Sequence, residues 1–456
     1  MRFRRPFGRR RLAVAGVVAL AGLGGVVVVT RPSGRGRSAV EVQASGAPAP
    51  GAAAEPPGGP PAVDDPLAHF GPPSVSSTAP GPSSSSSSST SSTTSSGPVT
   101  VPTRLPAPTT TTTVMDCASA SPVYVFGLER RPDGSGWAAG GNPALQRSTD
   151  GGLTWTPACL PAGAVTGAGA LYGVVFDAVQ RHGWAVGGSG GHPVVFRTVD
   201  GGDHWLTGRV PDGIAGTLMD VEFPDDTHGW AVGPLTGNGP ANASGGVVLA
   251  TTDGGATWVT QAVPAGIGRL SRASFVDPAH GWAVGMATGG QPVLIATTDG
   301  GATWANQTLP AGIRELRDVG FLDGRTGWAV GALPVPLPAE PGKDDPGVIL
   351  TTVDRGTTWT QQATTVGSLW SLQVIDGQTL FAGGGYGLFS THDGGGTWAK
   401  QAFTLPALDA VSFSDATHGW VSHSMFSVVC RTDDGGRTWV GSDVRGGYKG
   451  SACTSS

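Results

Sequence analysis

The eight residues Ser148-Thr149-Asp150-Gly151-Gly152-Leu153-Thr154-Trp155 carry the pattern that decides the fold, [Ser/Thr]-x-Asp-x-Gly-x-Thr-Trp. Six further copies begin at Thr198, Thr251, Thr297, Thr352, Thr391 and Thr432, and we call all seven segments the Asp words. Their aspartates are Asp150, Asp200, Asp253, Asp299, Asp354, Asp393 and Asp434, separated by 50, 53, 46, 55, 39 and 41 residues. His204 departs from the pattern by replacing the threonine. Periods of this length are typical of β-propeller blades, so seven copies predict seven blades.

Each Asp word has the composition of a hairpin turn that is stabilised by hydrogen bonds to its own side chains. The aspartate can accept hydrogen bonds from backbone N–H groups of its own turn, and glycine adopts positive φ without strain. The threonine and the tryptophan then favour the start of a strand. The word resembles the Asp-box, or BNR, repeat, which implies a turn between the third and fourth strands of a blade, on the rim away from the ligand face. We therefore interpret the seven aspartates as scaffold residues.

A second repeated element, Gly-Trp-Ala-Val-Gly, precedes most Asp words. It occurs at 183–187, 229–233, 281–285 and 327–331, with looser copies at 136–140 and 419–421 and a Leu-Phe-Ala-Gly variant at 380–383. With an apolar strand before it and another before the Asp word, each period contains four short strands. The sequence therefore predicts an all-β, seven-bladed propeller of four-stranded blades within residues 116–456. No strand needs to be exchanged to close the ring.

The first 115 residues form three segments of a different kind. Residues 1–11 contain six arginines, and residues 12–30 contain no charge. At ~1.5 Å per residue, a helix over 12–30 approaches the ~30 Å hydrocarbon core of a bilayer. We expect a transmembrane signal anchor with residues 1–11 in the cytoplasm, and a cleaved signal peptide is the alternative. Residues 31–115 are rich in Pro, Ala, Gly, Ser and Thr, which predicts a disordered stalk.

Both alternatives place the propeller outside the cytoplasm, where disulfides persist. The four cysteines, Cys117, Cys159, Cys430 and Cys453, have no CxxC spacing, and they allow three pairings. We predict Cys117 with Cys159 and Cys430 with Cys453, because each bond ties a terminus to the first or last blade.

Charge separates one group of residues from the rest of the predicted propeller. Residues 116–456 contain 18 lysines and arginines against 29 aspartates and glutamates, which argues against binding to duplex nucleic acid. Arg269, Arg272, Arg314 and Arg317 nevertheless cluster in the segments that enter the fourth and fifth blades, on the face opposite the Asp words. They are either dispersed surface residues paired with acids such as Glu315, or a patch that binds an acidic protein segment or an anionic glycan.

Histidines and carboxylates raise two further possibilities. His182, His228, His280 and His418 precede the Gly-Trp element in four different blades, so a turn-capping role is favoured over a shared metal site. Asp-box repeats also occur in sialidases, which use a tyrosine nucleophile, and in other glycoside hydrolases, which use paired carboxyl groups. The chain has four tyrosines and no Phe-Arg-Ile-Pro signature. We predict no catalytic residues, no cofactor and no metal, and we keep a glycoside hydrolase as the alternative.

The Asp words together with elements such as Asp277-Pro278-Ala279-His280-Gly281-Trp282-Ala283-Val284-Gly285 resemble the photosystem II stability and assembly factor family. The resemblance covers most of residues 121–441. It implies a seven-bladed propeller that binds membrane-protein intermediates and uses an arginine patch. The predicted anchor and stalk are not features that this family requires. The sequence therefore predicts a monomeric, membrane-tethered, extracytoplasmic propeller that binds an envelope protein or an anionic glycan without catalysing a reaction.

Overall fold

The computed structural model describes residues 115–116, 124–142, 144–165, 168–236, 245–335, 346–362, 366–403, 405, 407–423, 427–445 and 453. The predicted transmembrane segment 12–30, stalk residues 31–114 and Cys117 lie outside these residues. Within the described part of the chain, no helix has the length and the hydropathy needed to cross a membrane.

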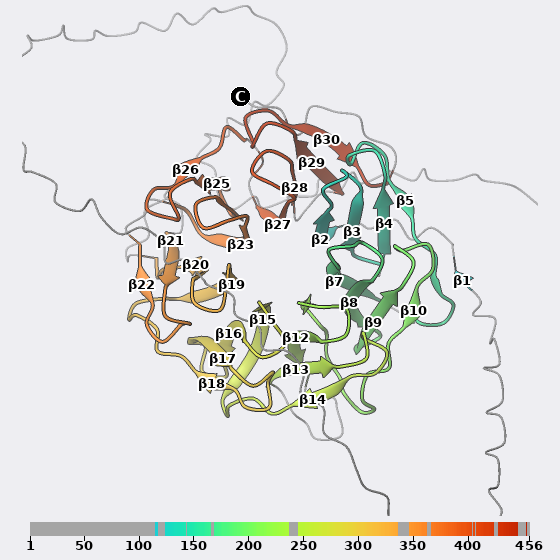
Figure 1. Cartoon of the computed structure of the whole chain (residues 1–456), viewed down its shortest axis with the longest axis horizontal. Helices are drawn as coiled ribbons and strands as arrows, with labels where there is room; N and C mark the ends of the chain where they lie inside the picture. The colour runs from blue at the N-terminus through green and yellow to red at the C-terminus, as the bar shows by residue number, and fades with distance from the viewer. Residues whose placement is uncertain are drawn as a thin grey trace, which may run out of the picture. The chain divides into compact units, whose positions relative to one another are not determined.

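Seven four-stranded antiparallel sheets form a closed ring around a central channel, as the sequence predicts (Figure 1). We number these blades 1–7 in chain order. The inner strands are β2 (Val125–Arg130), β7 (Gly169–Phe176), β11 (Asp220–Glu222), β15 (Ile267–Phe275), β19 (Glu315–Phe321), β23 (Leu369–Val374) and β27 (Leu408–Phe413). The second strands are β3 (Gly136–Gly140), β8 (Gly183–Ser189), β12 (Gly229–Leu235), β16 (Gly281–Ala287), β20 (Gly327–Ala332), β24 (Leu380–Gly384) and β28 (Gly419–His423).

The outer half of each blade contains the third and fourth strands. The third strands are β4 (Ala144–Ser148), β9 (His192–Thr198), β13 (Gly245–Thr251), β17 (Pro292–Thr297), β21 (Gly347–Thr352), β25 (Gly387–Thr391) and β29 (Val428–Thr432). The fourth strands are β5 (Thr156–Pro157), β10 (Leu206–Thr207), β14 (Val259–Gln261), β18 (Ala305–Asn306), β22 (Thr360–Gln361), β26 (Ala399–Lys400) and β30 (Val440–Asp443). Each sheet contains four consecutive strands, so no strand is exchanged between blades.

A separate two-stranded pairing lies outside the seven four-stranded sheets. Strand β1 (Met115–Asp116) pairs antiparallel with β6 (Leu160–Pro161). Met115, the last residue of the predicted stalk, has a backbone that pairs with Pro161. Cys159, which precedes β6, is in a disulfide.

Neighbouring blades pack through a recurring aromatic pair, which explains the Gly-Trp element. Between blades 4 and 5, the ring of Trp282 stacks on Phe321 with centroids 3.5 Å apart. The Nε1–H of Trp282 donates to the Arg355 carbonyl oxygen at 2.9 Å. The glycine before the tryptophan leaves room for the phenylalanine on the inner strand of its own blade, because a Cβ on Gly281 would lie 2.2 Å from Phe275. These stacks bury large apolar rings between blades, which is the main stabilising contribution in such a ring.

Each Asp word connects a third strand to a fourth strand, and its own side chains hold the turn. In blade 4, Asp299 Oδ1 accepts a hydrogen bond from the Thr303 backbone N–H at 2.9 Å, and Oδ2 accepts one from the Thr303 hydroxyl at 2.6 Å. The Thr297 hydroxyl donates to Asp299 Oδ1 at 2.8 Å and accepts from the Gly301 N–H at 2.8 Å. In blade 2, Nδ1 of His204 replaces the threonine hydroxyl, 2.7 Å from Asp200 Oδ2.

The interface between blades 7 and 1 closes the ring with polar contacts in place of the aromatic stack. Arg130 pairs with Gly136 as Phe321 pairs with Gly327, so an arginine occupies the phenylalanine position. Its guanidinium lies 5.9 Å from the centre of the Trp420 ring, and its backbone N–H donates to Ser412 Oγ at 2.8 Å.

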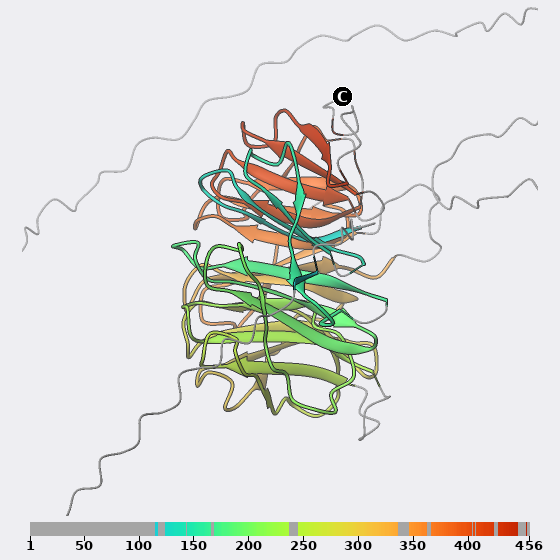
Figure 2. The same cartoon turned by 90° about the vertical axis from the view of Figure 1, so that its right-hand side faces the viewer.

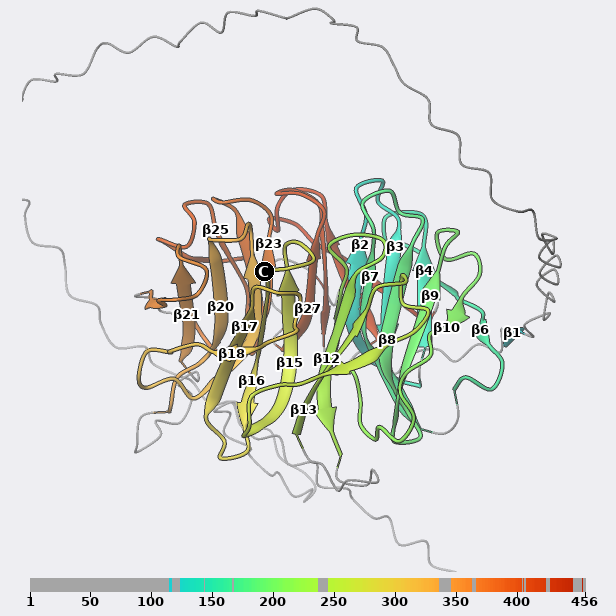
Figure 3. The ribbon, with the colours of Figure 1, turned by 60° about the horizontal axis from the view of Figure 1, so that its bottom comes forward.

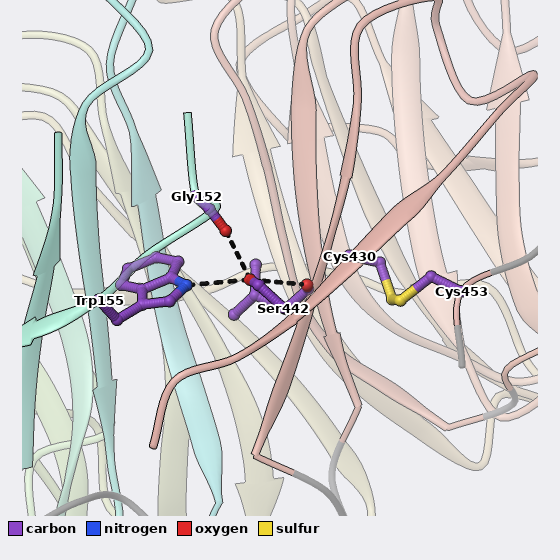
Figure 4. The surroundings of a disulfide bond; sticks show 6 residues. Gly152, Trp155, Cys430, Ser442 and Cys453 are labelled. Atoms are coloured by element: carbon purple, nitrogen blue, oxygen red, sulfur yellow. Dashed lines mark hydrogen bonds between the residues drawn. A yellow bond between two sulfur atoms is a disulfide. The ribbon is translucent and has the colours of Figure 1, made fainter. Parts of the chain in front are cut away.

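A serine on the last strand completes this closure (Figure 4). The Trp155 Nε1–H donates to Ser442 Oγ at 3.0 Å, and the Ser442 hydroxyl donates to the Gly152 carbonyl oxygen. On the neighbouring strand β29, Cys430 forms a disulfide with Cys453, with Cα atoms 5.8 Å apart. This is one of the two bonds that the sequence predicts, and it attaches the C-terminal segment to blade 7.

Candidate functional site

The two ends of the ring carry different loops. The strands run from one end to the other, so the loops after the first and third strands share one end (Figure 2, Figure 3). The Asp words lie at this end. The loops after the second and fourth strands lie at the opposite end, where a cavity of about 470 Å³ opens at the channel. We call this opening the mouth.

The mouth brings together three of the four predicted arginines. Arg269 and Arg272 of β15 and Arg317 of β19 line it, in agreement with their predicted place on the face opposite the Asp words. Arg314 is not among its lining residues. It lies just before β19, where its Nη2 is 3.2 Å from Glu315 Oε1. The binding role of all four arginines stays a prediction.

Glu315 fixes the position of the guanidinium of Arg317. Its carboxylate is mostly buried, and Oε2 lies 3.0 Å from Arg317 Nε. The Arg317 side chain is nevertheless 41% exposed. The predicted pairing of the arginines with Glu315 is therefore present, but it leaves Arg317 accessible at the mouth.

Arg269 and Arg272 differ in how much of each is available to a ligand. Arg269 is exposed. Arg272 is half-buried, and its Nη1 donates to the carbonyl oxygens of Met219 at 3.1 Å and Ser271 at 3.0 Å. Arg272 also lines the channel below the mouth, so its charge acts on the carboxylates there.

Four carboxylates surround the channel, which has a cavity of about 310 Å³. Two of them hold neighbouring blades together. Asp220 Oδ2 accepts from the Ala273 N–H of the next blade at 2.9 Å, and Asp318 Oδ2 accepts from the Leu372 N–H at 2.7 Å. Burial raises the pKa of Asp318 to about 7, although the nearby Arg272 opposes this shift. Burial also raises the pKa of Asp220.

The other two carboxylates, Glu129 and Glu222, are half-buried. They line the channel together with residues of all seven blades. Burial raises the pKa of Glu129 to about 8, with Arg131 opposing the shift. Burial raises the pKa of Glu222 well above its usual range, and the charges of Asp220, Asp318 and Glu129 add to the effect. The channel therefore contains carboxyl groups that hold protons near neutral pH.

The mouth also contains aromatic residues that are not among the predicted site residues. Phe126 and Tyr172 line it with stacked rings whose centroids are 4.9 Å apart. Trp370 lines it as well, and its Nε1–H donates to Ser368 Oγ at 3.0 Å. The sequence contains one signal for this site. Trp370 is the single tryptophan outside the two repeated elements, so its role differs from that of the others.

The four histidines that precede Gly-Trp elements belong to separate turns. In each turn, Nδ1 of the histidine lies 2.8–2.9 Å from an aspartate of the same turn. The pairs are His182 with Asp177, His228 with Asp225, His280 with Asp277 and His418 with Asp415. These contacts are those of a turn cap. Within the described residues, no group of three or more potential ligands is placed to hold a metal ion.

The chain matches no protein-family model and no curated protein. Solved structures do match. YCF48 bound to a D1 peptide has a TM-score of 0.51 and 18% identity, over 69% of this chain and 92% of that one. YCF48 from Cyanidioschyzon merolae has a TM-score of 0.50 and 16% identity, over 70% and 97%.

A glycoside hydrolase also matches. An ancestral GH74 enzyme has a TM-score of 0.53 and 13% identity, and the match covers 72% of this chain and 47% of the enzyme. This chain has a YCF48-like propeller fold. Identities this low establish the fold alone, so the function has to be argued from the site.

Proposed function

We propose that this propeller is a non-catalytic protein-binding module, tethered outside the cytoplasmic membrane by residues 12–30, and that its partner binds at the mouth. The observation that carries the proposal is the convergence of accessible arginines and aromatic rings from different blades on one cavity. Arginine and aromatic side chains are the types most enriched at the energetic centres of protein interfaces. YCF48, which shares the fold, has been captured with a D1 peptide, and this supports a peptide or protein ligand here.

The charge distribution supports an anionic group on that ligand. The predicted propeller carries a net charge of −11, so the arginines at the mouth form a local exception. A guanidinium presents a planar set of donors that suits carboxylates. An anionic partner is repelled by most of the surface of the propeller and attracted by the arginines at the mouth. This favours one binding orientation.

Site-specific photo-crosslinking in the native host tests this proposal. A photo-reactive residue replaces Ser271 at the mouth in the full chain, and a matched variant carries it at Ala302, an exposed position in an Asp word. We expect a crosslinked protein from position 271 and none from position 302. Equal crosslinking from both positions, or crosslinking from 302 alone, would contradict binding at the mouth. Mass spectrometry of the adduct separates a protein from an anionic glycan.

A glycoside hydrolase is the second candidate, because the channel holds carboxyl groups with raised pKa values and the GH74 enzyme shares the fold. A protonated carboxyl near neutral pH can act as a general acid. Two facts weigh against it. Asp220 and Asp318 already accept backbone hydrogen bonds, and Glu129 and Glu222 lie in the wall of a closed ring, which a polysaccharide can enter only through an end.

Turnover of a panel of glycosides and polysaccharides decides between the candidates. We expect no turnover by the full chain. Turnover that is lost in Glu129→Gln or Glu222→Gln, with unchanged thermal stability, would instead establish the hydrolase. Both glutamines keep the size of the side chain while removing the proton that an acid catalyst transfers.

A further inference from the structure

The residues at the mouth occupy one equivalent position in successive blades. In six inner strands, the pairing with the second strand shifts register by one residue at an equivalent place, which is the mark of a β-bulge, and β15 has a second shift at Gly268. The residues skipped at the six equivalent shifts are Phe126, Tyr172, Ser271, Arg317, Trp370 and Asp409. A bulge turns a side chain away from the regular alternation of the strand. All six residues line the mouth.

Blade 3 supplies the seventh member. Met219 immediately precedes β11, its backbone N–H donates to the Val232 carbonyl oxygen at 2.7 Å, and it also lines the mouth. Leu218 before it is fully buried, and a buried leucine or valine precedes each of the other six residues as well. We call the seven residues the mouth ring. The equivalent position thus presents a different side chain in each of the seven blades.

The side chains of the mouth ring divide it into two arcs. Blades 1–3 contribute Phe126, Tyr172 and Met219, which are apolar or aromatic and half-buried. Blades 4 and 5 contribute the cations, because Arg317 belongs to the mouth ring and Arg269, on the same strand as Ser271, also lines the mouth. An apolar arc therefore faces a cationic arc across one opening, and Trp370 of blade 6 and Asp409 of blade 7 complete the ring between them.

We propose that the mouth ring sets specificity, and that it selects an extended protein segment in which an acidic side chain neighbours an aromatic or large aliphatic one. This inference rests on the proposed function and names the chemistry of its partner. The acidic group pairs with Arg269 and Arg317, since Nη1 of Arg272 already donates to two carbonyl groups. The apolar group packs on the aromatic rings, because the Trp370 Nε1–H is satisfied by Ser368 and leaves the ring surface for contact.

The channel below explains why the acidic group stays at the mouth. Asp220, Glu222 and Asp318 surround the channel beneath the arginines. An anion that moved deeper would leave the accessible guanidinium groups of Arg269 and Arg317, which is unfavourable. A segment that carried only acidic residues would gain the ion pairs and lose the contact with the apolar arc. The two chemistries are therefore needed together.

Fluorescence anisotropy with designed peptides tests this inference on the purified full-length chain. The probes are labelled ten-residue Gly/Ser peptides whose central pairs are Asp-Trp, Asp-Ala, Asn-Trp and Lys-Trp. We expect Asp-Trp to bind about tenfold more tightly than Asp-Ala or Asn-Trp, and Lys-Trp to bind most weakly. Equal affinity for Asp-Trp and Asp-Ala, or for Asp-Trp and Asn-Trp, would overturn the inference.

Variants locate the binding and control for folding. Arg317→Gln and Trp370→Leu should each weaken Asp-Trp binding about tenfold. Arg355→Gln and Val353→Ala in an Asp word, both exposed, are the matched controls and should leave it unchanged. Ser271→Lys adds a cation at the mouth and should tighten Asp-Trp binding about threefold without affecting Asn-Trp. Unchanged Asp-Trp affinity in Arg317→Gln, Trp370→Leu and Ser271→Lys alike would overturn the inference.

The peptide measurements test this inference, and the crosslinking experiment tests the proposed function. If no peptide binds but crosslinking from position 271 captures a protein in the native host, the mouth binds a partner of another chemistry and this inference fails alone. If crosslinking from position 271 also captures nothing, the proposed function fails with it.

Discussion

The two ends of the ring are made by the same seven blades, yet they differ in how their side chains are used. At the Asp-word end, the aspartate hydrogen-bonds within its own turn in every blade, and even His204 reproduces the contact of the threonine it replaces. At the mouth, one equivalent position holds seven different residues. Residues whose hydrogen bonds are completed inside the turn are needed for the fold. Residues that differ from blade to blade at an equivalent backbone position are not needed for the fold, and they can bind a partner.

The difference between the two ends is tested most strongly by one small substitution at each end. Gly202 of an Asp word has φ of 89°, and a Cβ there would lie 2.1 Å from Trp137. Gly202→Ala should therefore lower the free energy of unfolding by about 3 kcal/mol, through backbone strain and overpacking. Ser271→Ala at the mouth should change it by less than ~0.5 kcal/mol. Urea unfolding followed by tryptophan fluorescence measures both, and similar losses would break the distinction between the ends.

The channel carboxyls and the Asp-word carboxyls should respond to pH in opposite directions. The folded-state pKa of Glu129 is raised to about 8. Its contribution to stability is present below its ordinary pKa, near 4.5, and is lost as the pH rises through 8. Glu129→Gln should remove this loss, which we expect to be on the order of 2 kcal/mol because the side chain still borders the channel. Parallel stability profiles for the two proteins between pH 4.5 and 8 would contradict the raised pKa.

Asp299 provides the opposite case. The hydrogen bonds from the hydroxyl and the backbone of Thr303 lower its pKa to about 2. Its contribution is therefore present above the ordinary aspartate pKa and is lost as the pH falls through 2. Asp299→Asn loses one acceptor and should lower Tm by about 2 °C at pH 7. The difference between the two proteins should shrink toward pH 2, and a constant difference would show that the charge is irrelevant to the turn.

The smallest effect is expected where one Asp word departs from the others. Arg355 has φ of 69°, a conformation that the other six Asp words fill with glycine. Arg355→Gly should raise the free energy of unfolding by about 0.5 kcal/mol, because relief of the left-handed strain slightly exceeds the added entropy of the unfolded chain. The Trp282 Nε1 hydrogen bond goes to the backbone carbonyl at this position and is kept. A destabilised variant in urea unfolding would mean that the arginine side chain has a structural role of its own.

The repeated elements made most of the fold predictable from the sequence. The spacing of Asp150 and its six equivalents predicts the number of blades, and the Gly-Trp elements mark the second strands, because a periodic sequence imposes a periodic structure. The start of β1 at Met115 was not predictable, because a two-residue pairing leaves no periodic pattern. The substitution of Arg130 for a phenylalanine at the closing interface also needed the register of the strands.

The sequence predicted the arginines of the site, but it did not predict the aromatic residues that β-bulges turn into the mouth. Arg269, Arg272 and Arg317 stand out because the rest of the propeller is acidic, but Arg314 shares the same loop region and does not line the mouth. Phe126 and Tyr172 look like ordinary strand residues in the sequence, since a bulge that turns them into the mouth depends on pairing between strands. A variable residue after each buried leucine or valine of the inner strands was the signal that could have revealed them.

The central claim is that the mouth, and not the Asp-word end, binds the partner. The most direct measurement is the yield of photo-crosslinked protein from position 271 in full chains that also carry Arg269→Glu and Arg317→Gln, compared with chains that carry Arg355→Glu. We predict at least a tenfold loss of crosslinked partner in the double variant, with unchanged Tm, and an undiminished yield in the control. An undiminished yield in the double variant would contradict the account.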